Sequence, residues 1–373
     1  MKKSKYKVDL GLLISLILMA IISIITIKFS TTILPNHMNA LALKQIMWYA
    51  IGFGLVFLIM YLGNNFIFKY RWHIYITIII SLILLLIFAK PINNAKCWFS
   101  LPGIGTIQPS EFMKIILIIV LGNMINEFRN KYQNPTIKQE FIFLLKVILV
   151  VSIPSILTFL QPDTGVVLIY LLITIIMLFI AGIRYRWFII LFSIILFFVG
   201  SVLIIYFIST DLFVNIFGSD FFLRVDRLLD WSNKSGFQLK NGMSAIGSAG
   251  LIGNLKVPVY FPEAQTDFIF AVYASTFGFL GSIILLCIIT YFDIKLITTA
   301  IKTKDMTSKY IIAGIVGMLI YQQLQNIGMT FGLMPITGIT LPFISYGGSS
   351  LLSYMIMIGI IFNISNSTFR YKN

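Results

Sequence analysis

Apolar residues along this chain gather into ten runs, each about as long as a membrane-spanning helix, and polar segments separate them. The runs cover residues 10–28, 46–63, 73–89, 112–127, 141–160, 165–182, 187–208, 268–291, 310–333 and 350–366. A transmembrane helix needs about 17–25 mostly apolar residues. The pattern therefore predicts an all-α polytopic membrane protein with ten transmembrane helices, built as one membrane domain over residues 1–373.

Several features modify this regular pattern. The fourth run is the weakest because Asn123 and Asn126 interrupt it, and the turn residues of 161–165 predict a tight hairpin between the fifth and sixth helices. A large outer loop, 209–267, is predicted between the seventh and eighth spans. Proline and glycine in 334–349 predict an irregular, re-entrant segment, which a membrane tolerates only where protein buries it or where it lines a cavity.

The composition agrees with a membrane protein and excludes a soluble globular domain. Of the 373 residues, 58% are hydrophobic and 11% are charged. The first apolar run follows a lysine cluster but lacks a small-residue cleavage site, so we interpret it as a retained helix and not as a signal peptide. Cys97 and Cys287 have no metal-binding spacing and are poorly placed for a mutual disulfide.

The net charge of +15 has two explanations, nucleic-acid binding or the positive-inside bias of a membrane protein. With the N-terminus inside, 17 Lys and Arg residues lie in inner segments, 9 in outer segments and 2 within spans. This distribution favours membrane topology and makes nucleic acid the weaker explanation. It predicts a multi-pass protein of the cytoplasmic membrane with both termini in the cytoplasm. The outer segments are rich in Gly, Pro, Trp and acids, so we expect the active face to be outward.

Three acids stand at helix mouths on the outer face: Glu111, Asp163 and Asp267. One explanation gives each acid a structural role alone, as an N-cap or first-turn residue stabilised by free backbone N–H groups and the helix dipole. Ionisable groups next to a membrane span are also functional candidates, and Asp267 is the strongest because a long apolar run follows it. Glu263, four residues earlier, follows Pro262 and is interpreted as a loop residue that orients substrate or caps the helix.

Basic residues near the same face are candidates for binding an anionic substrate. Lys114 follows Glu111 by three residues, so it can pair with that acid, reach outward to the membrane surface or meet the substrate. Arg224 and Arg227 lie in a predicted amphipathic surface helix, 221–231, which either anchors to lipid headgroups or binds a pyrophosphate. Trp98 either stacks on a sugar or anchors at the interface, and Ser345 of the re-entrant segment is a further substrate-binding candidate.

Several long segments, in this order, resemble the SEDS family of shape, elongation, division and sporulation proteins, which includes RodA, FtsW and SpoVE. They are CWFSLPGIGTIQPSEFMK, QPDTG, GFQLKNGMSAIGSAGLIG, FPEAQTDFIFAV and NIGMTFGLMPITGITLPFISYGGSS. The resemblance covers essentially the whole chain, and its wording favours the RodA-like branch. The chain departs from the family pattern at Lys96-Cys97, where the family has two arginines, and at Gln265, where it has histidine. It also has Ser275 and Thr276 where the family has acids.

The resemblance implies a peptidoglycan glycosyltransferase that polymerises lipid II, an undecaprenyl-pyrophosphate-linked disaccharide peptide, during cell-wall elongation. Transfer with inversion needs one general base, and pyrophosphate is already a good leaving group, so a carboxylate pair of the glycosidase kind is unnecessary. We assign the base to Asp267 and the pyrophosphate to Lys114, Arg224 and Arg227. A divalent cation, Mg²⁺ or Mn²⁺, is a candidate cofactor with Glu111 and Asp163 as ligands.

Partner and alternatives follow from the same resemblance. Family members work with a class B penicillin-binding protein, a transpeptidase, which is therefore the expected partner within the membrane. Two other classes remain open from the sequence. A flippase or transporter of lipid-linked precursors predicts ionisable residues near the bilayer midplane, and a non-catalytic scaffold predicts that Asp267 is dispensable for polymer formation.

Overall fold

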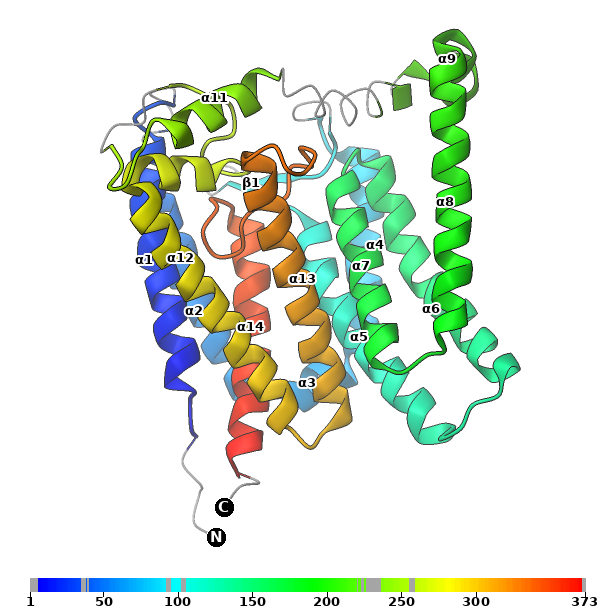
Figure 1. The fold of residues 1–373 in the computed structure, drawn as a ribbon. Coiled ribbons are helices and arrows are strands. Elements are labelled where there is room, and N and C mark those ends of the chain that lie inside the picture. The colour runs from blue at the N-terminus through cyan, green and yellow to red at the C-terminus, as the bar shows by residue number, and fades with distance from the viewer. Residues whose placement is uncertain are drawn as a thin grey trace.

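The structure is a computed structural model that describes residues 6–34, 38, 40–91, 95–101, 105–219, 221–222, 225, 236–254 and 259–370. Long helices run between the two ends of a bundle, and short helices and loops close the end opposite the termini (Figure 1). The helices are α1 (Leu10–Ser30), α2 (Leu41–Leu62), α3 (Asn64–Lys69), α4 (Arg71–Phe88), α5 (Pro109–Lys131), α6 (Ile137–Leu160), α7 (Thr164–Ile180), α8 (Tyr185–Ile208), α9 (Thr210–Phe217), α11 (Phe237–Gly247), α12 (Ile269–Lys302), α13 (Met306–Thr330) and α14 (Gly348–Arg370).

A helix occupies each of the ten predicted spans, and the all-α polytopic class is confirmed. Within the described part of the chain, seven helices are long and apolar enough to cross a membrane: α1, α2, α4, α6, α8, α12 and α14. The apolar helix α7 has 17 residues, while α5 and α13 carry more polar groups. The exact number of ten membrane crossings stays a prediction.

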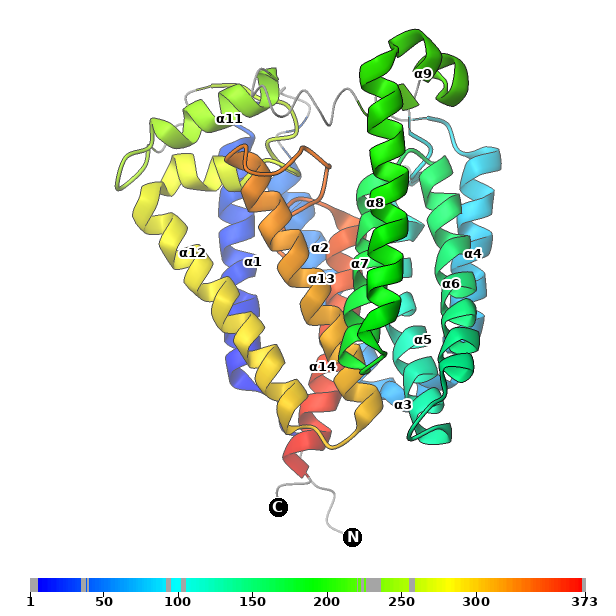
Figure 2. The same ribbon diagram turned by 45° about the vertical axis from the view of Figure 1, so that its right-hand side comes forward.

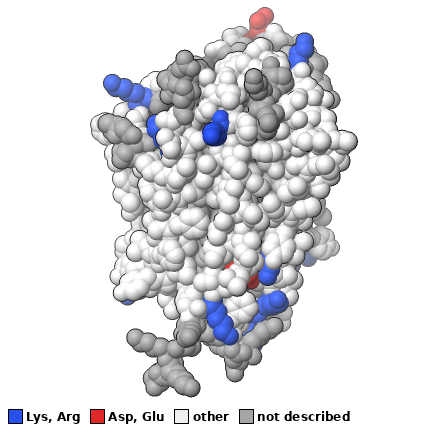
Figure 3. Space-filling view, turned by 90° about the vertical axis from the view of Figure 1, so that its left-hand side faces the viewer, with Lys and Arg blue, Asp and Glu red and all other residues white. Residues whose placement is uncertain are grey.

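The surface has the character of a membrane protein. In Figure 3, Lys and Arg lie toward the two ends of the molecule, and a broad band between them carries no charged side chain on that face. Helix α8 stands at the edge of the bundle (Figure 1) and has no buried residue, as expected of an apolar helix that faces lipid.

Helices begin where side chains can satisfy free backbone N–H groups. Asp9 accepts hydrogen bonds from the backbone of Gly11 and starts α1, while Thr136 and Gln139 form a capping box at α6. Asp305 starts α13 in the same way. The predicted hairpin is present, because α6 ends at Leu160 and α7 begins at Thr164, capped by Asp163.

Helices α5 and α14 form the centre of the bundle. Helix α5 lies against α4, α6, α7, α13 and α14, and almost every residue from Pro109 to Gly122 is buried. Its weak apolar character therefore reflects contact with protein in place of lipid. Asn123 follows the same rule, since its amide nitrogen donates to the backbone oxygen of Ile119 at 2.8 Å.

Two features of the end opposite the termini are not evident from the apolar pattern. A short antiparallel hairpin pairs β1 (Phe99–Leu101) with β2 (Gly105–Ile107) just before α5. The long loop 209–267 contains α9 and α11, and α11 packs on α12. The predicted surface helix 221–231, with Arg224 and Arg227, lies almost entirely outside the described residues.

Helix α12 opens at Gly278, whose φ of 65° and ψ of −162° are not helical. Figure 2 shows the bend that results near the start of this helix. The freed backbone groups bond to a neighbouring loop: Phe279 N donates to Gly250 O at 3.0 Å, and Leu280 N donates to Leu251 O at 3.1 Å. A Cβ on Gly278 would lie 2.3 Å from the nitrogen of Gly253, so only glycine fits.

We expect Gly278→Ala to destabilise the protein by about 3 kcal/mol, because it adds both a backbone clash and an unfavourable φ. Thermal unfolding of the purified protein in detergent measures this. The matched control is Gly54→Ala in α2, where a Cβ meets nothing within 4 Å and helix propensity favours alanine by about 1 kcal/mol. Equal melting temperatures for the two variants would contradict the interpretation.

Candidate functional site

Two irregular segments meet at the end of the bundle opposite the termini. One is 331–347, between α13 and α14, and the other is 261–268, which leads into α12. Tyr346 N donates to Gln265 O at 2.8 Å, and the hydroxyl of Ser345 donates to Thr266 O at 2.7 Å. The segment linking α13 to α14 folds back into the bundle near β1, as Figure 1 shows. This is the buried, irregular segment that the sequence predicts.

Asn326, near the end of α13, joins the two segments. Its amide nitrogen donates to the backbone oxygens of Asp267 and Ile339, both at 2.8 Å. Asn326 is fully buried, so these hydrogen bonds form away from water and fix the backbone firmly. Asp267 thus receives its position from α13 as well as from its own chain.

The carboxyl group of Asp267 lies at the junction and is partly exposed. A Cβ added at Gly338, whose φ is 72°, would lie 3.5 Å from Oδ2 of Asp267, so this glycine keeps the space beside the carboxylate open. Burial is the largest cause that raises the pKa of Asp267 to about 7, and the negative charges of Glu263 and Asp163 contribute to that rise. A carboxylate with such a pKa is suited to accept a proton near neutral pH.

Asp163 supplies a second carboxyl group from the start of α7. Its Oδ1 accepts from Val166 N at 3.2 Å, and its Oδ2 accepts from the amide of Gln108 at 2.6 Å. Burial, helped by the charge of Glu111, raises the pKa of Asp163 to about 6. The start of α7 touches the re-entrant segment closely, because a Cβ on Gly165 would lie 2.7 Å from Thr337 O.

Glu111 and Lys114 form an ion pair inside the bundle. The distance between Lys114 Nζ and Glu111 Oε2 is 2.7 Å, and Lys114 is completely buried. The ammonium also lies 5.2 Å from the ring centroid of Tyr354 in α14. Of the three roles open from the sequence, the structure has the pairing with Glu111. In this conformation Lys114 does not reach the surface, and its contact with substrate stays a prediction.

Two other predicted residues have structural partners here. The carboxylate of Glu263 accepts from the hydroxyl of Thr266 at 2.6 Å within the turn before α12, and α12 itself begins without a side-chain cap. Ser345 uses its hydroxyl twice within the protein, donating to Thr266 O and accepting from Leu341 N at 2.8 Å. We therefore infer that Ser345 holds the two segments together. Its hydroxyl hydrogen is already donated to Thr266 O, and its predicted contact with substrate stays a prediction.

The remaining predicted residues are not drawn into this junction by any contact that the structure describes. Trp98 is partly exposed beside Cys97, whose thiol donates to Gln161 O at 2.8 Å. Arg224 and Arg227 lie outside the described residues. No group of three or more His, Cys, Asp or Glu residues within the described ranges is arranged to hold a metal ion. The metal role of Glu111 and Asp163 stays a prediction.

The positions that depart from the family pattern are buried, except Lys96, which is partly exposed. Gln265 is 8% exposed, and its amide donates to Glu263 at 3.3 Å while its Oε1 has no hydrogen-bond partner. Ser275 and Thr276 are packed where α12 meets the loop at Gly253, and Ser275 O accepts from Asn254 N. Small hydroxyl side chains fit this space, whereas a carboxylate there would be buried.

Several residues of the junction were not singled out from the sequence. Gln108, Asn326 and Tyr354 all contact the predicted acids or bases. A usable signal existed for Asn326, because Gln322, Gln325 and Asn326 form a polar stripe within an apolar span, and such groups need buried partners. Gln325 indeed donates to Pro335 O at 2.7 Å, and Gln322 to the hydroxyl of Tyr354 at 2.9 Å.

Comparison with known protein families identifies the chain. Residues 6–370 match the model of the family that joins FtsW, RodA and SpoVE, described as cell cycle proteins. The chain belongs to this family. Stage V sporulation protein E of Bacillus subtilis is 30% identical and covers 98% of this chain and 99% of its own length. The family that the motifs predict is therefore confirmed.

Two further relatives carry enzyme names. A probable peptidoglycan glycosyltransferase FtsW of Lactococcus lactis is 31% identical over 78% of this chain and 75% of its own. Peptidoglycan glycosyltransferase MrdB of Helicobacter pylori is 32% identical over 89% of this chain and 84% of its own. Because these identities are so similar, the RodA-like branch within the family stays a prediction.

Solved structures have the same fold. A chain from a structure described as the structural coordination of polymerization and crosslinking by a peptidoglycan synthase complex matches with a TM-score of 0.82 and 24% identity, covering 98% of this chain and all of that one. The rod shape determining protein RodA of Thermus thermophilus matches with a TM-score of 0.69 and 24% identity, covering 97% and 98%. At this identity the likeness establishes the fold alone.

The buried ion pair gives a prediction about stability. We expect Lys114→Met to destabilise the protein by about 3–5 kcal/mol, because Glu111 would be left buried without its counter-charge. Adding Glu111→Gln to Lys114→Met should recover much of the loss. Thermal unfolding of both single variants and the double variant measures the coupling. Strictly additive losses would mean that the two groups do not depend on each other.

Proposed function

We propose that this chain is a peptidoglycan glycosyltransferase that polymerises lipid II, with Asp267 as its general base. The observation that carries the proposal is the carboxyl group of Asp267, partly exposed at the junction of the two irregular segments, with its pKa raised to about 7. Membership of the FtsW, RodA and SpoVE family and the glycosyltransferase names of its relatives support the reaction class.

In the proposed reaction, the 4-hydroxyl oxygen of the acceptor sugar attacks the anomeric carbon of the donor. Asp267 takes the hydroxyl proton as the new C–O bond forms, and the bond to the lipid pyrophosphate breaks with its electron pair. The product is a β-linked glycan, one disaccharide longer, together with undecaprenyl pyrophosphate. One base suffices because the leaving group needs no protonation. The raised pKa makes Asp267 a stronger base than an ordinary aspartate.

The proposed roles of the neighbouring charges are electrostatic. Asp163 helps to keep the pKa of Asp267 high, because its negative charge disfavours a second one nearby. Lys114 favours the charged form of Asp163, while Glu111 opposes it. We place Lys114 as a positioning residue in this conformation. The pyrophosphate, whose charge grows as the bond breaks, is assigned to Arg224 and Arg227, since guanidinium groups bind phosphate oxygens in pairs.

A transporter would be expected to have ionisable groups along a path through the bilayer. Among the described residues, Glu111, Asp163 and Asp267 gather toward one end of the bundle. Asp293, in the other half of α12, is buried separately and accepts a hydrogen bond from Gln323 at 3.3 Å. This arrangement favours chemistry at one face over transport.

The orientation and partner are also part of the proposal. Both termini lie at the end away from the junction (Figure 1), and the excess of Lys and Arg in the segments of that end supports a cytoplasmic location for it, with the junction outside. A class B penicillin-binding protein is the proposed partner, supported by the likeness to a chain of a complex that couples polymerization with crosslinking.

Asp267→Asn should lower the rate of lipid II polymerisation by about 10²–10⁴-fold, the usual contribution of a general base. For the wild type, the rate should rise as pH increases through about 7, because only the deprotonated carboxyl accepts the proton. The measurement is glycan-strand formation by purified protein, with the cognate transpeptidase present. Asp211→Asn, an exposed acid in α9, is the matched control. A near-normal rate in Asp267→Asn would eliminate the base and favour the scaffold alternative.

The same pKa makes a separate statement about stability. Between the usual pKa of an aspartate, about 3.9, and about 7, folded Asp267 holds a proton that the unfolded chain releases. Stability is therefore lost as pH rises through this window, and Asp267→Asn should raise the melting temperature above pH 7 but not at acidic pH. This thermal readout checks that the variant is folded and tests the pKa independently of catalysis.

The arginine pair makes a prediction about substrate concentration. Replacing both Arg224 and Arg227 by alanine should raise the KM for lipid II, because the pyrophosphate loses its charged hydrogen-bond donors. Steady-state polymerisation at a series of lipid II concentrations measures this, with Lys240→Ala in α11 as an exposed control. An unchanged KM would remove the arginines from the binding site and leave membrane anchoring as their role.

A further inference from the structure

A pocket lies between the end of α5 and the first turns of α6, at the end of the bundle that carries the termini. Its volume is about 270 Å³, and its lining residues are Met124, Glu127, Phe128, Lys131, Tyr132, Gln139, Ile142, Phe143 and Lys146. We call it the basic pocket. It is remote from the junction at Asp267, because α5 runs the length of the bundle between the two ends (Figure 1).

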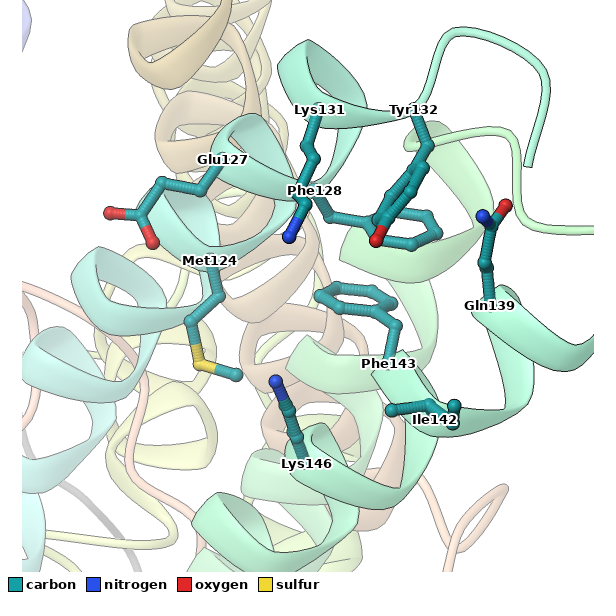
Figure 4. A pocket seen from close by; sticks show the side chains of 9 residues that line it. All are labelled: Met124, Glu127, Phe128, Lys131, Tyr132, Gln139, Ile142, Phe143 and Lys146. Carbon is teal, nitrogen blue, oxygen red and sulfur yellow. The ribbon is translucent and has the colours of Figure 1, made fainter.

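Two lysine side chains enter this pocket from opposite sides. Figure 4 shows Lys131 of α5 and Lys146 of α6 with their nitrogen atoms directed into the same space. Neither ammonium has a carboxylate within 4.0 Å among the residues described. Like charges that face one another repel, so this arrangement is favoured when an anion lies between them.

The nearby acid does not fill that role. Glu127 turns away from the lysines in Figure 4, and its carboxylate binds Arg71 of α4 at 2.7 Å. The charges of Glu127 and Arg71 cancel, which leaves the pocket with the two positive charges of Lys131 and Lys146.

The depth of Lys146 argues for a membrane ligand. It lies nine residues after Ile137, or about 14 Å along α6 from the start of the helix. Its neighbours Ile142, Leu145 and Leu149 are exposed apolar residues that face lipid. Lys146 is exposed, and its nitrogen is directed toward Lys131 across a pocket that includes the stacked rings of Phe128 and Phe143, 4.2 Å apart.

The other walls suit a phosphate group with apolar chains attached. Gln139 uses its amide oxygen for the capping box at Thr136 N, which leaves its amide nitrogen as a donor beside the pocket. Lys131 lies 5.4 Å from the ring centroid of Tyr132, which also lines the pocket. Ile142 continues the pocket onto the exposed apolar face of α6, where acyl chains would pack.

We propose that the basic pocket binds the phosphate of an anionic phospholipid, held between Lys131 and Lys146, with its acyl chains along α6. Basic pockets between helices at a membrane surface bind such headgroups. Under the orientation proposed above, this lipid belongs to the cytoplasmic leaflet. The site is independent of the lipid II reaction, because it uses none of the residues assigned to that reaction.

The test measures lipid binding by the full chain, purified in detergent, through native mass spectrometry and the shift in melting temperature. Phosphatidylglycerol should bind and raise the melting temperature of the wild type. Replacing both Lys131 and Lys146 by glutamine should weaken binding about 30-fold, which corresponds to about 1 kcal/mol for each lysine. Lys138→Gln, on the exposed first turn of α6, is the matched control and should bind as the wild type does.

Other arms distinguish the sources of the phosphate. Phosphatidylcholine with the same acyl chains should bind more weakly, since its net charge is zero, and inorganic phosphate should leave the melting temperature unchanged. If the double glutamine variant fails to fold, Lys131→Arg with Lys146→Arg keeps the charge and should retain the lipid. Four outcomes would each overturn the proposal. They are equal binding of both lipids, a rise in melting temperature with phosphate alone, no rise in the wild type with phosphatidylglycerol, and undiminished binding by a folded glutamine variant. Activity is not a readout, so the outcome is separate from that of the polymerase.

Discussion

Backbone that is buried without being helical must find hydrogen-bond partners from side chains, and the half of this protein opposite the termini is organised around that requirement. The segment 331–347 passes through the bundle with few backbone partners of its own. Ser23 of α1, Tyr49 of α2 and Gln325 of α13 each donate to one of its carbonyl oxygens. Since Asn326 binds this segment and Asp267 together, the position of the carboxylate follows from the same network.

The charges near Asp267 show how similar carboxyl groups in an environment with little water can acquire different pKa values. Glu111 is neutralised by Lys114 at 2.7 Å, whereas Asp163 receives hydrogen bonds from a helix start and a glutamine. Asp267 has the least compensation, because its described contacts involve mainly its backbone. The pKa of Asp267 is therefore raised more than that of Asp163, to about 7 compared with about 6. Three acids of similar appearance in the sequence thus have different chemistry.

The sequence predicts the helices well because the apolar runs are long and membrane topology restricts their number and direction. The hairpin at 161–165 and the re-entrant segment were also predictable, since proline and glycine mark them. What the sequence could not supply is which polar side chains meet. The partnership of Asn326 with Asp267 spans 59 residues and that of Gln108 with Asp163 spans 55. The opening of α12 at Gly278 depends on a loop that precedes it, so no local pattern predicts it.

The polar character of α5 has a consequence for how the protein enters the membrane. This helix is expected to partition poorly into lipid by itself. It carries Glu111 and Lys114 near one end and Glu127, Arg129 and Lys131 near the other. The adjacent helices α4 and α6 are apolar enough to partition by themselves. We therefore expect the translocation machinery to release α5 late, in the company of a neighbour. Correct insertion of this central helix then depends on the order in which helices are released during synthesis, as well as on its contacts in the folded protein.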